Sequence, residues 1–190
     1  MDIVADLMQQ VARGDNLSAI SSSVGGDAAS VKSALGMGLP LVLGSMANSA
    51  GKPGGTEALT SMLAQAGGRN PLDNMGSFLS NPAAAGGSGM VNALFGNQMG
   101  AIQAAIAQKT GLPPAAVGKV LEIATPLVVG YVGKMFVSQK MDAQSLTGLL
   151  GDQSKVALTS SPDAAALAHE MLATQDTPGG VSGILKKFFK

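Results

Sequence analysis

The sequence predicts an all-α protein. The chain of 190 residues is rich in alanine and holds 11 methionines, and both residue types favour helices. Its apolar residues recur mainly at intervals of three and four, which is typical of a helix with one buried face. The one compact run of β-favouring residues is 127–129, and its weaker counterpart is 41–43. We therefore expect a tandem duplication of a roughly five-helix unit, followed by C-terminal helices.

The duplication is inferred from two blocks that match at an offset of 86 residues, the separation of Pro40 and Pro126. Residues 38–44 read Gly-Leu-Pro-Leu-Val-Leu-Gly, and residues 124–130 read Ala-Thr-Pro-Leu-Val-Val-Gly. Further pairs at this offset are Ile20 with Ile106, Gly25 with Gly111, Val31 with Val117 and Leu35 with Leu121. Several matching blocks in the same order predict an internal repeat.

This organisation divides the chain into four parts. They are a first helical unit (1–67), a Gly/Pro-rich linker with a short amphipathic patch (68–87), a second helical unit (88–151), and a C-terminal helix with a basic amphipathic tail (152–190). We expect the two units to pack side by side. A unit of about 65 residues buries too little surface to be very stable alone.

Start and stop signals define the helices of the first unit. The predicted helix starts are Asp2, Asn16, Asp27, Pro40 and Thr56. The predicted stops are glycines, at Gly14, Gly25 and Gly51. Pro40 is expected to begin a strongly apolar fourth helix, because proline suits the first turn of a helix.

The remaining helices follow the same logic. In the second unit, Gly111, Pro113 and Pro126 mark the predicted helix boundaries. In the linker, Leu72, Met75, Phe78 and Leu79 are spaced for a short helix. Ser161-Pro162-Asp163 begins a helix with Leu167, Met171 and Leu172 on its apolar face.

Two apolar stretches bear on location. Residues 35–47 and 123–133 are uncharged, but both are shorter than the roughly 18–20 residues that span a bilayer. We interpret them as buried core helices, with Leu41, Val42, Leu127 and Val128 almost fully buried. The N-terminal residues lack the basic and apolar regions of a secretory signal. We expect a cytoplasmic protein, in keeping with the absence of cysteine.

The composition argues against several kinds of chemistry. Twelve basic residues balance twelve acidic ones, so the chain lacks the basic field typical of nucleic-acid-binding proteins. With no cysteine and one histidine, it lacks the ligand sets of common zinc sites. No phosphate-binding loop and no Gly-x-Ser-x-Gly nucleophile motif occurs. We expect no cofactor, no metal and no catalytic residues, so the protein is not predicted to be an enzyme.

Three side chains are the best candidates for chemistry: His169, Glu170 and Glu122. His169 lies beside Glu170 and is either half of an acid–base pair or a solvent-facing helical residue. Glu122 lies in an apolar helix three residues after Lys119. It is either one partner of an exposed ion pair with Lys119 or a buried functional carboxylate.

Residues 106–120 are similar to a helix-turn-helix, and residues 18–35 have the same shape. A helix that reads bases needs Arg, Lys, Asn or Gln on its exposed face. The second helix of each segment offers only small residues and one lysine: Ala115, Ala116, Gly118 and Lys119 in one, Ser30, Lys32 and Ser33 in the other. A structural helical corner is the favoured interpretation, and DNA binding is an alternative.

The C-terminal tail concentrates charge beside apolar residues. Its candidate contact residues are Ile184, Leu185, Lys186, Lys187, Phe188, Phe189 and Lys190. A basic amphipathic segment of this kind can touch an anionic membrane or a partner groove. Alternatively, both phenylalanines dock on the protein's own core.

The duplicated Gly-x-x-Pro…Val blocks, the Pro-Leu-Val-x-Gly helices and the Leu-Thr-x-x-Leu segments resemble the YidB-like family of bacterial domains of unknown function. The resemblance covers about residues 1–155. It implies an all-helical, soluble bacterial protein and brings no catalytic residues with it.

These observations predict a non-catalytic protein-interaction or self-assembly protein, with filaments or rings among the expected forms. Only 13% of the residues are charged, so repulsion between copies is weak. The expected partner is a second copy of the chain or another protein. Two alternatives stay open: a peripheral membrane or envelope-associated factor acting through the tail, and a helix-turn-helix-like DNA-binding protein.

Overall fold

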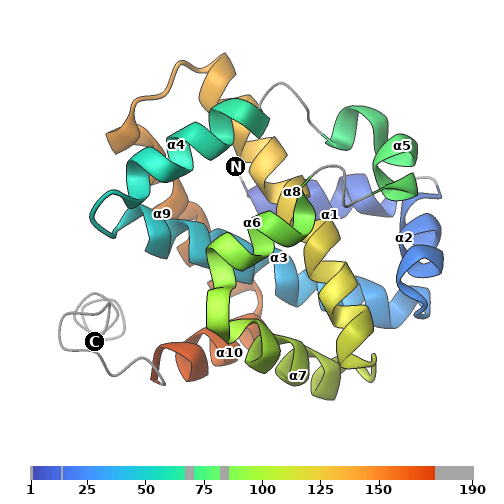
Figure 1. Cartoon of the computed structure of the whole chain (residues 1–190). Coiled ribbons are helices and arrows are strands. Elements are labelled where there is room, and N and C mark those ends of the chain that lie inside the picture. Colours follow the sequence, from blue (N-terminus) through green and yellow to red (C-terminus); the bar gives the residue numbers. More distant parts are fainter. Residues whose placement is uncertain (1, 14, 67–70, 82–85, 174–190) are drawn as a thin grey trace.

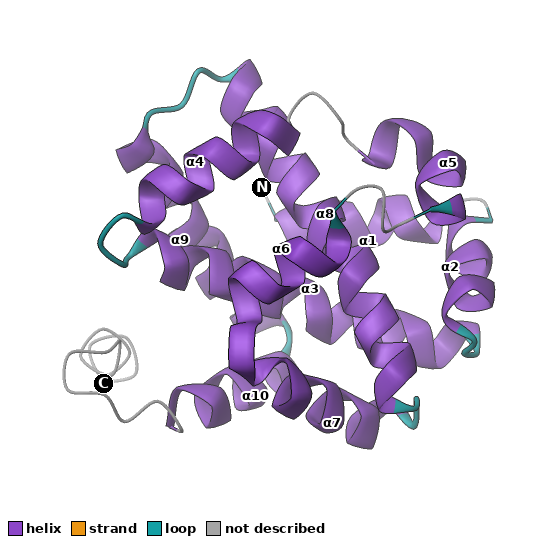
Figure 2. Ribbon diagram, viewed as in Figure 1, coloured by secondary structure: helices purple, strands orange, loops and turns teal. Residues whose placement is uncertain are grey.

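The computed structural model describes residues 2–13, 15–66, 71–81 and 86–173, and every regular element within these ranges is a helix (Figures 1 and 2). The all-α prediction is confirmed. The α-helices are α1 (Ile3–Ala12), α2 (Asn16–Val24), α3 (Ala28–Ala50), α4 (Gly55–Ala66), α5 (Met75–Ser80), α6 (Gly87–Phe95), α7 (Met99–Thr110), α8 (Pro114–Ser138), α9 (Ala143–Ser160) and α10 (Pro162–Ala173). There are also two short 3-10 helices: η1 (Pro71–Asn74) directly precedes α5, and η3 (Gly96–Gln98) lies between α6 and α7.

Several helix ends are those that the sequence predicts. The carboxylates of Asp2 and Asp27 accept hydrogen bonds from backbone N–H groups in the first turns of α1 and α3. Asp142 does the same for α9. Gly25 and Gly111 end α2 and α7 with φ of 77° and 75°, a conformation that glycine adopts without strain.

Pro40 lies inside α3 and does not begin a helix, so the predicted third and fourth helices of the first unit are one helix. The expected five-helix pattern is wrong at this point. Proline cannot donate to the carbonyl four residues earlier, which leaves the Gly36 carbonyl without that partner. The Ser161 hydroxyl donates to this carbonyl at 3.3 Å. Apolar packing on either side of Pro40, which is itself buried, stabilises the continuous helix.

Pro126 lies inside α8 in the same way and frees the Glu122 carbonyl. Here the neighbour is Gly87 at the start of α6. A side chain on Gly87 would collide with the Glu122 carbonyl, so this close approach requires glycine.

The centre of the molecule is the crossing of the two long helices, α3 and α8 (Figure 1). Helix α4 packs along α8, and α9 packs along α3. The helix after α3 therefore covers the long helix of the other half, and the helix after α8 does the same in return. The expectation of two units side by side is wrong, because the halves interlock.

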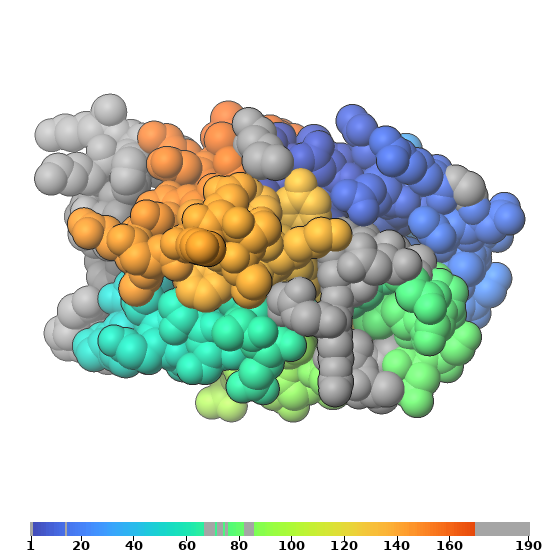
Figure 3. Space-filling model, turned by 90° about the horizontal axis from the view of Figure 1, so that it is seen from above, coloured from blue at the N-terminus to red at the C-terminus, as the bar shows by residue number. Residues whose placement is uncertain are grey.

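The surface shows the same interlocking. In the view from above (Figure 3), orange residues of the second half lie between blue N-terminal residues and teal residues of α4. The helices also follow one another in a matching order, with α1 to α4 corresponding to α6 to α9. This order agrees with a tandem repeat, which stays a prediction until the halves are superposed.

The core runs through both halves as one cluster. Leu41 is 3% exposed, and Val42, Leu127 and Val128 are fully buried, which confirms their predicted burial. Part of the predicted linker is also folded, since it forms η1 and α5 and buries Phe78. The division of the chain into four parts stays a prediction.

By length and composition alone, α3 and α8 could each cross a membrane. In this fold, however, 61% and 72% of their most apolar windows are buried within the protein. This burial agrees with the interpretation of both segments as core helices. It does not by itself decide the location of the protein.

Candidate functional site

The predicted contact residues of the tail, 184–190, lie outside the described residues. The hypotheses that the tail binds a membrane, a partner or the protein's own core therefore stay predictions. The other candidate residues can be placed.

His169 is exposed on α10, as the solvent-facing interpretation requires. The side chain of Glu170 is outside the described residues, so an acid–base pair between the two is not placed. Within the ranges that the structure describes, no three residues among His, Cys, Asp and Glu come together as a metal-binding group.

Glu122 is half-buried on α8 and accepts a hydrogen bond of 2.9 Å from the Ser88 hydroxyl on α6. Its partner is Ser88, and not the predicted Lys119. The burial in the alternative of a buried functional carboxylate is also wrong, and a functional role for Glu122 stays a prediction. The hydrogen bond joins α6 to α8 near the close approach at Gly87.

The segment 106–120 forms a helical corner, in which Gly111 turns the chain from α7 into α8. Ala116, Val117 and Val120 are buried in the core. Lys119 is exposed, so the first turns of α8 offer one cation to solvent. The helix that would have to read bases is a core helix, which supports the structural interpretation of this corner.

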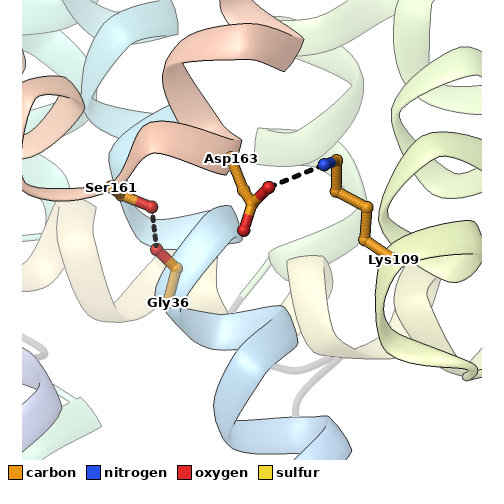
Figure 4. Close-up of polar contacts among 4 residues, drawn as sticks. All are labelled: Gly36, Lys109, Ser161 and Asp163. Carbon is orange, nitrogen blue, oxygen red and sulfur yellow. Dashed lines mark hydrogen bonds and ion pairs between the residues drawn. The ribbon is translucent and has the colours of Figure 1, made fainter.

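A polar groove of about 420 Å³ lies where α10 meets α3, α7 and α9. Its lining residues are Val4, Ser33, Gly36, Met37, Lys109, Ala157, Ser160, Ser161 and Asp163. Figure 4 shows its two polar contacts: Lys109 pairs with Asp163 at 2.6 Å, and Ser161 donates to the Gly36 carbonyl. Both groups of the ion pair are exposed, at 41% and 60%, so solvent screens their attraction. The Ser161 hydrogen bond joins the start of α10 to α3, and the ion pair joins α10 to α7.

Two further polar contacts join the N-terminal helix to the second half. The buried N–H of Ile3 donates to Gln153 Oε1 on α9 at 3.0 Å. The Tyr131 hydroxyl on α8 donates to Asp6 Oδ2 on α1 at 3.1 Å. Burial, followed by the hydrogen bond to Asp6, raises the pKa of Tyr131 above its ordinary value.

The exposed positions of α6, η3 and the first turns of α7 are uncharged, whereas the last turn of α7 exposes Lys109. We call the uncharged part the α6–α7 surface, and its members are Gly89, Asn92, Ala93, Gly96, Asn97, Gly100, Ala101 and Ala104. No charged residue and no histidine occurs between Asp73 and Lys109. Space around Gly89, Gly96 and Gly100 is open, since a side chain added there would meet no atom within 4 Å.

This surface was not identified from the sequence. The uncharged run between Asp73 and Lys109 was a visible signal, but it does not show which positions face outward. The structure supplies that, because α6 packs on α8 with its opposite side (Figure 1). Small side chains allow another backbone to approach closely, and no charge has to be desolvated.

The fold defines a helical protein in which two interlocked halves share one core. The chain belongs to a bacterial family, described as "Bacterial protein of unknown function (DUF937)", which matches residues 6–135. The matched region runs from α1 through nearly all of α8. No curated protein and no solved structure matches the chain.

Proposed function

We propose that this protein is a non-catalytic, self-associating protein of the bacterial cytoplasm, and that copies meet through the α6–α7 surface. The observation that carries the proposal is the lack of charge across that exposed face. Its partner is a second copy of the same chain, and no cofactor takes part.

Charge favours this partner. The chain has a formal net charge of zero, so two copies approach without net repulsion. Contact between two α6–α7 surfaces buries alanine and glycine against alanine and glycine, with asparagine amides available for hydrogen bonds. Such a contact between identical faces is two-fold symmetric and closes as a dimer.

The test is to place charge on the surface. In the variant Ala93→Arg/Ala101→Arg, two copies that meet face to face would bring four cations together. We expect wild-type protein to show at least the mass of a dimer by light scattering over a concentration series, and the variant to show the mass of one chain. The control is Ala12→Arg/Ala19→Arg, which adds equal charge at exposed positions of α1 and α2.

Circular dichroism of both variants verifies that they are folded. The proposal is wrong if wild-type protein is a monomer at every concentration. It is also wrong if the α6–α7 variant and the control lose association equally, because net charge would then explain the loss.

A further inference from the structure

Each half of this protein lacks a complete core of its own. Helix α9 packs most extensively on α3, in the other half of the chain, and α4 packs more extensively on α8 than on α3. The contacts Ile3–Gln153, Asp6–Tyr131 and Gly36–Ser161 also run between the halves. The fully buried residues of α3 and those of α8 belong to one apolar cluster.

The covalent link between the halves is short. Residues 81–86, Asn-Pro-Ala-Ala-Ala-Gly, separate the end of α5 from the start of α6. The interface described above requires one copy of residues 3–80 and one copy of residues 87–173. Nothing in its contacts requires that both come from the same chain.

We propose that copies of this chain exchange halves, so that residues 3–80 of one chain pack with residues 87–173 of another. The partner is a second copy, and the interface is the pair of helix contacts α3–α9 and α4–α8, remade between chains. This inference rests on the self-association proposed above and deepens it. An exchanged dimer has two lobes, and each lobe carries one α6–α7 surface. Contacts between these surfaces can therefore continue from dimer to dimer as a ring or a filament.

Concentration decides between the two arrangements, because the contacts are the same in both. A short connection gives the two halves of one chain an effective concentration on the order of millimolar. In dilute solution, the two halves of one chain therefore pack with each other, and no exchange takes place. Exchange is favoured when the chain folds at high concentration, and it then reverses slowly because separation opens the core.

The absence of cysteine makes a clean test possible. A Cβ atom on Gly44 of α3 would lie 3.5 Å from Ser154 Oγ of α9, so side chains at these two positions meet between the halves, and we choose them for a disulfide. In the full-length variant Gly44→Cys/Ser154→Cys this disulfide is the only one that can form within a single chain. It links a chain to itself in the closed monomer and links two chains after exchange.

We expect variant protein that is refolded in concentrated solution and then oxidised to run as a covalent dimer on a denaturing, non-reducing gel. Variant protein that is oxidised while dilute should run as one chain and should no longer form exchanged species when concentrated. The single variant Gly44→Cys is the matched control for random cross-linking. Covalent dimers in equal yield from the control would overturn the proposal.

The decisive outcome is the state of the disulfide in assembled protein. If light scattering shows assembly while every disulfide stays within one chain, exchange is wrong and association through the α6–α7 surface survives. A second measurement uses the wild-type chain, in case the variant does not fold. Wild-type oligomers formed during concentrated refolding should persist for hours after dilution if halves are exchanged. Their return to monomer within seconds would overturn the proposal.

Discussion

At the scale of single residues, burial separates side chains that look alike in the sequence. Leu127 lies on α8 with no exposed surface, whereas Val137 near the end of the same helix is 52% exposed. Both are apolar residues of one long helix. The difference lies in what covers them.

Replacement of Leu127 with alanine should lower the free energy of unfolding by about 2–5 kcal/mol, because it leaves a cavity in a packed core. The control Val137→Ala should change it by no more than about 0.5 kcal/mol, as is usual for surface positions. Urea unfolding, followed by circular dichroism, measures both. A loss below about 1 kcal/mol for Leu127→Ala would show that the helix is not part of the core.

Tyr131 should make stability depend on alkaline pH. Burial and the hydrogen bond to Asp6 raise its pKa in the folded state. A raised folded pKa means that the contribution is complete below the unfolded value of about 10 and is lost as pH rises through the folded pKa. Between pH 9 and 12 the urea midpoint of wild-type protein should therefore fall further than that of Tyr131→Phe. Equal slopes for the two proteins would show that this hydroxyl is not linked to folding.

Asp142 should act at the other end of the pH scale. Its hydrogen bonds to the Ser145 side chain and backbone N–H lower its pKa in the folded state. The stabilisation is therefore present above the unfolded pKa and is lost as pH falls through the folded pKa. Asp142→Asn keeps a good N-cap, so its melting temperature should match wild type at pH 7 and fall less below about pH 4. Asp142→Ala, which removes the cap, should melt lower at both pH values.

At the scale of elements, the two long helices show how proline can be misread. A proline in an apolar run predicts a helix start, because the first turn does not need its N–H group. In α3 and α8 the helix continues through the proline instead, and the freed carbonyl meets a group from elsewhere in the fold. Neither Ser161 nor Gly87 is close in sequence to the carbonyl that it meets, so no local pattern could have revealed these contacts.

A double-mutant cycle tests this explanation for α3. Ser161→Ala should lower the free energy of unfolding by roughly 0.5–1 kcal/mol, the usual worth of one hydrogen bond. In the Pro40→Ala background the same change should cost much less, because the substituted residue donates its own backbone N–H to the Gly36 carbonyl. Chemical denaturation of the four proteins gives the coupling. Identical costs in both backgrounds would show that the serine does not compensate for the proline.

At the scale of the whole molecule, the repeat makes a geometric prediction. Residues 1–67 and 88–151 should superpose as helical units, with Pro40 over Pro126 and Gly25 over Gly111. A crystal structure measures this directly. Unrelated positions for those pairs would end the argument for duplication, whatever the order of the helices.

The sequence predicted the helical class, several caps, the left-handed glycines and the buried centres of both long helices. Each of these depends on residues close together in the chain. It did not predict which helix covers which, because periodicity marks the buried side of a helix and not its neighbour. The Lys109–Asp163 pair and the interlocked halves were missed for that reason. The α6–α7 surface was missed in a different way, since absence of charge does not reveal exposure.

The packing of α4 on α8 also sets the time at which this protein can fold as it is made. A ribosome that has completed α4 has produced none of the helix that covers it, and α9 leaves the ribosome last of the four helices in the two main contacts. The first half therefore waits with its apolar face uncovered while about 70 further residues are added, at a synthesis rate of roughly 5–20 residues per second. During those seconds, the apolar side of α4 that α8 later covers is exposed to water. The order in which the helices emerge therefore keeps α4 uncovered until α8 has been made, and keeps α3 uncovered until α9 has followed.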